Sequence, residues 1–189
     1  MKTSDLKSIS ENLIDTFNSA GEASIDLYEK GLRIDIKEDN SPVSNGDIKV
    51  NEIITNKIKE LTPKIPIVSE ETVNLNIKNT NKIFWLIDPI DGTKEYIAGK
   101  EEYTLNAALI INTVPVLGLV GAPRKKRLFY TYGPGESFLI EKGETKKINC
   151  KKKQPKEKIV ALSSALKPSD IILKKLKEFN VNSIVKMAS

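Results

Sequence analysis

An apolar segment that ends in two aspartates constrains this chain more than any other feature. Residues 83–87 (Ile-Phe-Trp-Leu-Ile) are typical of a buried β-strand, and Asp88 follows them directly. Pro89 is expected to end the strand, and Asp91 comes three residues after Asp88. The turn between them directs both carboxylates toward one point, beside the main-chain carbonyl of Ile90. Such an all-oxygen set suits Mg²⁺, a hard cation that is often shared with a substrate phosphate.

A second acidic group follows another short apolar segment. Glu70 and Glu71 come directly after residues 65–68 (Ile-Pro-Ile-Val) and Ser69. If the two strands are neighbours, Glu70 reaches the same point as the aspartates, and divalent cations relieve the repulsion among the carboxylates. Two such cations can bracket a phosphate ester, one activating water and the other stabilising the leaving oxygen.

Each acidic segment also has a simpler interpretation. The Asp-Pro-Ile-Asp-Gly segment at 88–92 is a common turn in which aspartates hydrogen-bond to their own backbone. The pair Glu70 and Glu71 is equally typical of a solvated surface loop. The occurrence of both segments in this order, with a tryptophan-bearing strand between them, favours a metal site.

Composition excludes several other classes of function. Histidine is absent, which removes the usual general base and the usual zinc ligand. The single cysteine, Cys150, cannot form an internal disulfide, and residues 1–13 lack the apolar core of a secretory signal. No apolar segment is long enough to span a membrane, so we expect a cytoplasmic protein.

The net charge of +5 leaves a nucleic-acid partner to consider. Lysines gather over 146–158, which permits a patch that follows phosphates. A solvated linker or strand edge is the favoured interpretation, because elsewhere many lysines alternate with carboxylates along predicted helix faces. We therefore expect no nucleic acid among the partners.

Hydrophobic periodicity predicts an α/β chain in two parts. The predicted elements of the first part are a helix at 5–30, a strand at 34–36, a turn at 39–42, a helix at about 46–61 that Ser44 and Asp47 cap, a surface loop at 72–82, and antiparallel strands at 105–111, 116–121, 127–131 and 136–140. A strand at 158–163, a helix at 168–179 and a strand at 183–186 then begin an α/β unit. We expect an N-terminal metal-binding α+β domain at 1–150 and the start of a C-terminal α/β domain at 151–189.

That second part is predicted to be incomplete. Two parallel strands and one helix cannot cover both faces of a parallel sheet. We therefore expect a chain that is truncated at its C-terminus, with an unfinished sheet.

The acidic segments resemble those of a known family of metal-dependent phosphatases. The matching residues are Ser41-Pro42-Val43-Ser44-Asn45-Gly46-Asp47, Ser69-Glu70-Glu71 and Asp88-Pro89-Ile90-Asp91-Gly92-Thr93. They resemble the inositol monophosphatase family, and the resemblance implies a sugar-phosphatase-like α/β/α/β layered sandwich. It also implies a homodimer and a small-molecule phosphate ester as substrate.

The resemblance assigns roles to the matching residues. It implies that Glu70, Asp88, Asp91 and the carbonyl of Ile90 bind two or three Mg²⁺ ions. It implies that Asp47 and Thr93 together orient and deprotonate the attacking water. It also implies that Gly92 and Thr93 bind the substrate phosphate.

The segments after the second aspartate resemble one branch of that family. Lys94-Glu95-Tyr96 and Glu102-Tyr103-Thr104-Leu105-Asn106-Ala107-Ala108 are similar to the bisphosphate nucleotidases. That similarity implies hydrolysis of the 3'-phosphate of adenosine 3',5'-bisphosphate to give AMP and phosphate.

Two departures leave alternatives open. Residues 163–166 read Ser-Ser-Ala-Leu where the branch has Ser-Arg-Ser-His. The C-terminal Trp-Asp segment of the family does not occur within residues 1–189. The alternatives are an inositol or sugar monophosphate phosphatase of the same family and a truncated, inactive homologue.

Overall fold

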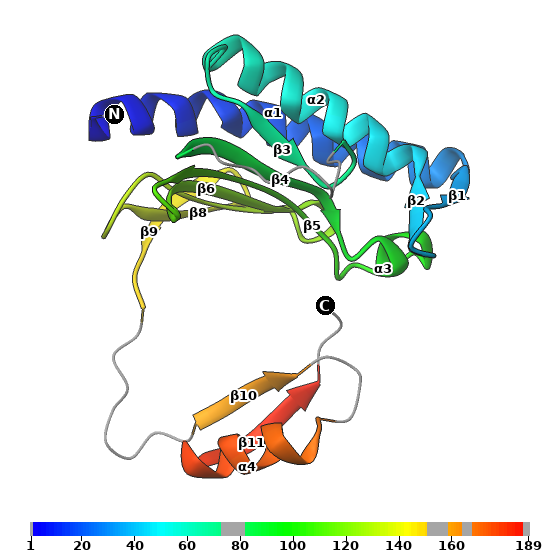
Figure 1. Cartoon of the computed structure of the whole chain (residues 1–189), viewed down its shortest axis with the longest axis vertical. Coiled ribbons are helices and arrows are strands. Elements are labelled where there is room, and N and C mark those ends of the chain that lie inside the picture. Colours follow the sequence, from blue (N-terminus) through cyan, green and yellow to red (C-terminus); the bar gives the residue numbers. More distant parts are fainter. Residues whose placement is uncertain (1, 73–81, 151–158, 164–167, 187–189) are drawn as a thin grey trace. The chain divides into compact units, whose positions relative to one another are not determined.

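The chain forms two compact units, Met1–Asn149 and Cys150–Ser189. The computed structural model describes residues 2–72, 82–150, 159–163 and 168–186 (Figure 1). Most of the surface loop predicted at 72–82 lies outside these residues, and so does Lys158, the first residue of the strand predicted at 158–163.

A seven-stranded sheet forms the body of the first unit, with its strands in chain order (Figure 1). They are β3 (Ile67–Ser69), β4 (Ile83–Asp91), β5 (Thr104–Ile111), β6 (Val114–Ala122), β7 (Arg127–Thr131), β8 (Ser137–Glu141) and β9 (Glu144–Ile148). The β3–β4 pair is parallel, and every later pair is antiparallel. The predicted meander is confirmed, and β9 extends it by one strand.

Two long helices, α1 (Thr3–Lys30) and α2 (Asn45–Leu61), lie side by side over one face of this sheet (Figure 1). Their apolar faces and the inner face of the sheet form the core, whose fully buried side chains include Leu13, Ile54, Ile58, Trp85, Leu105, Leu109 and Leu119. Burying such a side chain contributes about 1.5–3 kcal/mol relative to leaving it exposed. The core thereby fixes the position of β4 under α2.

Strand β4 differs from its prediction in two ways. It is buried on one face only, because Trp85 and Ile87 point into the core while Leu86 is 47% exposed. The expectation that Pro89 ends the strand is wrong, since β4 continues to Asp91. Pro89 has no N–H to donate to the ladder, and the pairing with β5 shifts its register between Asp88 and Asp91.

Three short elements near the candidate site were not predicted. Strand β2 (Pro42–Ser44) pairs antiparallel with β1 (Ile34–Ile36), where only a turn at 39–42 was expected between β1 and the following helix. Helix α3 (Thr93–Ile97) follows β4, and the 3₁₀ turn η1 (Pro123–Lys125) joins β6 to β7. Helix α3 converts the end of β4 into a strand–turn–helix corner.

The second unit contains the predicted strand–helix–strand sequence. Strand β10 (Ile159–Ser163) pairs in parallel with β11 (Val181–Lys186), and α4 (Asp170–Glu178) connects them. None of the helices in the described part of the chain combines the length and the apolar character needed to cross a membrane.

Candidate active site

The first turn of α2 fixes the orientation of Asp47. Ser44 is the N-cap of α2, and its Oγ accepts hydrogen bonds from the backbone N–H groups of Gly46 and Asp47. In return, the Ser44 hydroxyl and backbone N–H both donate to Asp47 Oδ2, at 2.6 and 2.8 Å. This reciprocal arrangement is the predicted capping box. It leaves Oδ1 of Asp47, a residue that is only 1% exposed, available for another contact.

That contact is the hydroxyl of Thr93, the first residue of α3. Thr93 Oγ1 lies 3.1 Å from Asp47 Oδ1 and 3.1 Å from the carbonyl oxygen of Ile90. A hydroxyl has one proton, so its donation to the carboxylate leaves oxygen lone pairs that can accept from another molecule. Three of the residues that the sequence placed in one site therefore meet around a single oxygen atom.

Strand pairing brings the second acidic segment to the same edge. Ser69 of β3 is aligned with Ile87 of β4, and the backbone N–H of Glu70 donates to the Ile87 carbonyl at 3.0 Å. Glu70 therefore lies beside Asp88, as expected if the two strands are neighbours. Within the described residues, Asp88 Oδ1 is buried without a hydrogen-bond partner.

The surroundings of Asp88 disfavour its ionised form. Burial, the charge of Glu70, a hydrogen bond with Glu70, and the charges of Asp91 and Asp47 together raise the pKa of Asp88 to about 7, and burial has the largest effect. A carboxylate with an unpartnered oxygen among other carboxylates is stabilised in its ionised form by a cation. The residues present therefore fit a hard divalent ion, because all the donors are oxygen atoms.

Lys37 is a cation in this region that no sequence motif pointed to. Its Nζ lies 3.0 Å from Glu71 Oε1 and 3.3 Å from Glu70 Oε1. Burial alone lowers the pKa of Lys37, but the hydrogen bonds and charges of Glu71 and Glu70 outweigh it and the net shift is upward. Burial raises the pKa of Glu71, against the effect of Lys37.

The carboxylates of the described residues do not form a complete set of metal ligands. Among the described residues, no group of three or more acidic, histidine or cysteine side chains is arranged to hold a metal ion as it stands. Glu70 instead makes its ion pair with Lys37, and Asp91 is exposed at the end of β4.

Gly92 makes the corner between β4 and α3 possible. Its φ of 92° lies in the left-handed region, where a side chain is strained. A Cβ atom there would also come 3.1 Å from the carbonyl oxygen of Glu102. Gly92 joins Asp91, the last residue of β4, to Thr93, the first residue of α3, so Gly92 and Thr93 follow the acidic residues directly in the chain.

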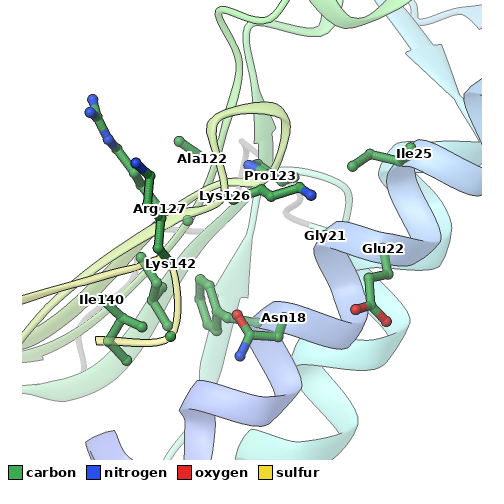
Figure 2. A pocket seen from close by; sticks show the side chains of 14 residues that line it. Asn18, Gly21, Glu22, Ile25, Ala122, Pro123, Lys126, Arg127, Ile140 and Lys142 are labelled. Atoms are coloured by element: carbon green, nitrogen blue, oxygen red, sulfur yellow. The ribbon is translucent and has the colours of Figure 1, made fainter. Parts of the chain in front are cut away.

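A separate pocket of about 440 Å³ lies between α1 and the strands β6 to β8 (Figure 2). Its lining includes the apolar side chains of Phe17 and Leu128 and the basic residues Lys126, Arg127 and Lys142. None of the acidic residues at the end of β4 lines this pocket, so it is not part of the candidate active site.

Comparisons with known proteins show the family to which the chain belongs. Residues 5–188 match the model of the inositol monophosphatase family, and the chain belongs to that family. It is a phosphatase that hydrolyses phosphate monoesters, and the predicted family and α/β fold class are confirmed.

Several relatives are named for one branch of the family. The chain is 34% identical over 169 residues to the 3'(2'),5'-bisphosphate nucleotidase CysQ of Escherichia coli O157:H7, which covers 88% of this chain and 68% of that protein. The crystal structure of CysQ from Bacteroides thetaiotaomicron matches with a TM-score of 0.75 at 26% identity, over 96% of this chain and 73% of that one. An IMPase/NADP phosphatase complexed with Mg²⁺ and phosphate shares the fold, with a TM-score of 0.72 at 18% identity over 96% and 67% of the two chains.

Proposed function

We propose that this protein is a Mg²⁺-dependent phosphatase that hydrolyses the 3'-phosphate of adenosine 3',5'-bisphosphate to give AMP and phosphate. The observation that carries the proposal is the Glu70–Asp88 pair, in which Asp88 Oδ1 has no hydrogen-bond partner among the described residues, next to the Asp47–Thr93 hydrogen bond. The substrate comes from the bisphosphate nucleotidase branch, to which the 34% identical relative belongs by name. We place such a soluble enzyme in the cytoplasm.

Glu70, Asp88, Asp91 and the carbonyl of Ile90 are the groups that would hold Mg²⁺, in two or three ions. When bound, Mg²⁺ offsets the charge of the carboxylates and of the phosphate dianion and makes water a better nucleophile. The known relative with bound Mg²⁺ and phosphate supports the class of ion.

Asp47 and Thr93 form the proton-handling pair. The Thr93 hydroxyl donates to Asp47 Oδ1, so its oxygen keeps lone pairs that can accept a water O–H. A threonine hydroxyl is a poor base alone, but as its oxygen takes a proton from water it can pass its own proton to the Asp47 carboxylate. Asp47 keeps its orientation during this transfer because Oδ2 is held by Ser44.

Gly92 and Thr93 are proposed to receive the substrate phosphate. Gly92 carries no side chain beside the acidic residues, so a phosphate can approach the backbone closely. The N–H groups of this corner are the donors that the phosphate oxygens would meet.

The test measures phosphate release by the full chain from adenosine 3',5'-bisphosphate and from inositol 1-phosphate, with Mg²⁺ or with EDTA. We expect Mg²⁺-dependent turnover of the first substrate and a loss of roughly 10²–10⁴-fold in kcat for Asp47→Asn. Asp91→Asn and Asp88→Asn should also abolish turnover. Asp26→Asn, an exposed acid of α1, is the matched control and should retain it.

Each alternative has its own result. Turnover of inositol 1-phosphate alone would reassign the substrate within the family. Absence of Mg²⁺ binding at millimolar concentration in a calorimetric titration, together with no turnover, would identify an inactive homologue.

A further inference from the structure

Tyr96, one helical turn after Thr93, is buried among three chain segments. It is 1% exposed, and its Oη donates to the carbonyl oxygen of Ser24 in α1 at 2.7 Å. Its ring lies 4.9 Å from that of Tyr103, whose Oη is 2.9 Å from Ser24 Oγ. Burial raises the pKa of the Tyr96 phenol, so the phenol remains a protonated donor.

The ring of Tyr96 rests directly on the backbone of Gly46. A Cβ atom at Gly46 would lie 2.6 Å from Tyr96 Cε1 and 2.8 Å from Cζ, distances at which something must shift. Gly46 is the residue before Asp47. The backbone N–H of Tyr96 donates to the Gly92 carbonyl at 2.9 Å, in the turn that contains Thr93.

Tyr96 therefore contacts the residue before Asp47 through its ring and belongs, through its backbone, to the helical turn that begins with Thr93. Asp47 belongs to α2 and Thr93 to α3, and the two residues are 46 positions apart in the sequence. A shift of α3 relative to the start of α2 would lengthen their 3.1 Å contact directly.

We propose that Tyr96 is a positioning residue that sets the separation between Asp47 and Thr93 by packing against Gly46 while its hydroxyl is held by Ser24. The inference rests on the proposed roles of Asp47 and Thr93. Tyr96 itself touches neither substrate nor metal, and acts only through the backbone of its neighbours.

A double-mutant cycle tests the contact. Gly46→Ala inserts a methyl group into the ring, and Tyr96→Leu removes the ring, so each should lower kcat by roughly 10–100-fold with KM nearly unchanged. In the Tyr96→Leu background the added methyl has room, and Gly46→Ala should cost less than about threefold. Tyr96→Phe keeps the ring and should keep most of the activity.

Tyr28→Leu is the matched control. It removes a ring from the same aromatic group, 6.1 Å from Tyr96, without touching Gly46. We expect it to lower the thermal midpoint as Tyr96→Leu does but to leave kcat in place. Equal kcat values for Tyr96→Leu and wild type, or equal costs of Gly46→Ala in both backgrounds, would overturn the proposal.

Two further measurements separate this proposal from the proposed function. Asp47→Asn and Thr93→Val are assayed in the same series, and normal activity in both would reject their roles rather than the contact. If the wild-type chain releases no phosphate, the proposal is tested instead by NMR, from the position of the Thr93 methyl resonance in a threonine-labelled sample. It should shift in Tyr96→Leu and stay in place in Tyr28→Leu, and an unshifted resonance in Tyr96→Leu would overturn the proposal.

Discussion

The two units of the chain differ in what surrounds their apolar side chains. In the first unit, Leu13, Leu105 and Leu109 have no exposed surface, because α1 and α2 close over the sheet. In the described part of the second unit no residue is buried, and Leu162 and Phe179 are 69% and 68% exposed. A pair of strands with one short helix has too few layers to enclose such side chains.

The core that stabilises the fold and the proposed active site lie in the same unit. Every residue proposed for the active site lies in the first unit, on or directly beside helices and strands that also contribute to the core. Trp85, for example, lies on β4 three residues before Asp88. Its indole N–H donates a hydrogen bond to Thr62 Oγ1 at the end of α2. We therefore expect the site and the stability of the first unit to respond together, and to be insensitive to changes in the second.

The largest expected effect contrasts Leu109→Ala with Leu162→Ala. Leu109→Ala leaves a cavity in the closed core and should lower the free energy of unfolding by about 2–5 kcal/mol. Leu162→Ala removes an exposed side chain and should change it by less than about 0.5 kcal/mol. Urea unfolding followed by fluorescence of Trp85, the single tryptophan, reports on the first unit.

A decrease of more than about 1 kcal/mol in the free energy of unfolding of Leu162→Ala would contradict this contrast. It would show that the second unit contributes to the stability of the first. Leu109→Ile, which keeps the volume, controls for nonspecific sensitivity at the core position and should cost less than about 1.5 kcal/mol.

The next effect is stabilisation of the first unit by Mg²⁺. An ion that binds only the folded chain at 100 times its dissociation constant adds about 2.7 kcal/mol to the free energy of unfolding. The Trp85 transition should therefore move to higher urea with Mg²⁺. Asp88→Asn should remove this response, because it deletes the carboxylate whose buried oxygen has no hydrogen-bond partner within the described part of the chain.

Matched ionic strength with K⁺ is the control for general screening. A K⁺ shift as large as the Mg²⁺ shift would contradict a specific site. Lys37→Gln adds a refinement, because the ammonium of Lys37 competes for Glu70; it should strengthen Mg²⁺ binding in a calorimetric titration.

A smaller effect is expected from pH in the absence of metal. The pKa of Asp88 is raised from 3.8 to about 7 in the folded chain, so the folded state holds a proton that the unfolded state releases above pH 4. This contribution to stability is complete below pH 4 and is lost as the pH rises to about 7. Water screens part of it, because Asp88 is only half-buried.

Urea midpoints in EDTA should therefore fall between pH 5 and pH 7, and Asp88→Asn should flatten this slope. The pKa values of Glu136 and Glu141 are lowered, by ion pairs with Lys147 and Arg127 respectively, so their contributions change at lower pH, outside this window. A midpoint that rises across the window would mean that Asp88 is already ionised in the folded chain.

The sequence was most informative where one local rule decides the structure. The helical spacing of α1 and α2, the Ser44 cap and the alternating strands of the meander each follow from residues close together in the chain. The aspartates of β4 were identified in the same way, because they follow a short apolar segment directly, although the strand continues through Asp88 to Asp91.

Two kinds of feature could not be predicted from local sequence: strands with few apolar residues, and contacts between segments that are far apart in the chain. Strand β9 has one half-buried residue, Ile148, and otherwise exposed charged or polar side chains, so it shows no alternation. Lys37 meets Glu71 across 34 residues, and Tyr96 meets Ser24 across 72. A lysine among charged residues and a tyrosine in a short helix carry no local sign of such partners.

The smallest effect compares the helix caps of the two units. Ser44 caps α2 with Oγ contacts to two N–H groups, whereas Ser169 caps α4 through a single contact of 3.5 Å with Ile172. Ser44→Ala should lower the free energy of unfolding by about 1 kcal/mol, and Ser169→Ala should leave the Trp85 transition unchanged. Ser44→Thr retains the acceptor and should recover most of the loss.

The same substitution separates stability from chemistry within the first unit. In Ser44→Ala, Asp47 Oδ2 keeps the backbone N–H of residue 44 but loses the hydroxyl that holds it at 2.6 Å. Asp47 is then less constrained toward Thr93, so kcat should fall while KM stays nearly constant. An unchanged kcat with the expected loss of stability would mean that the Thr93 contact alone orients Asp47, and that the cap acts on the helix and not on the chemistry.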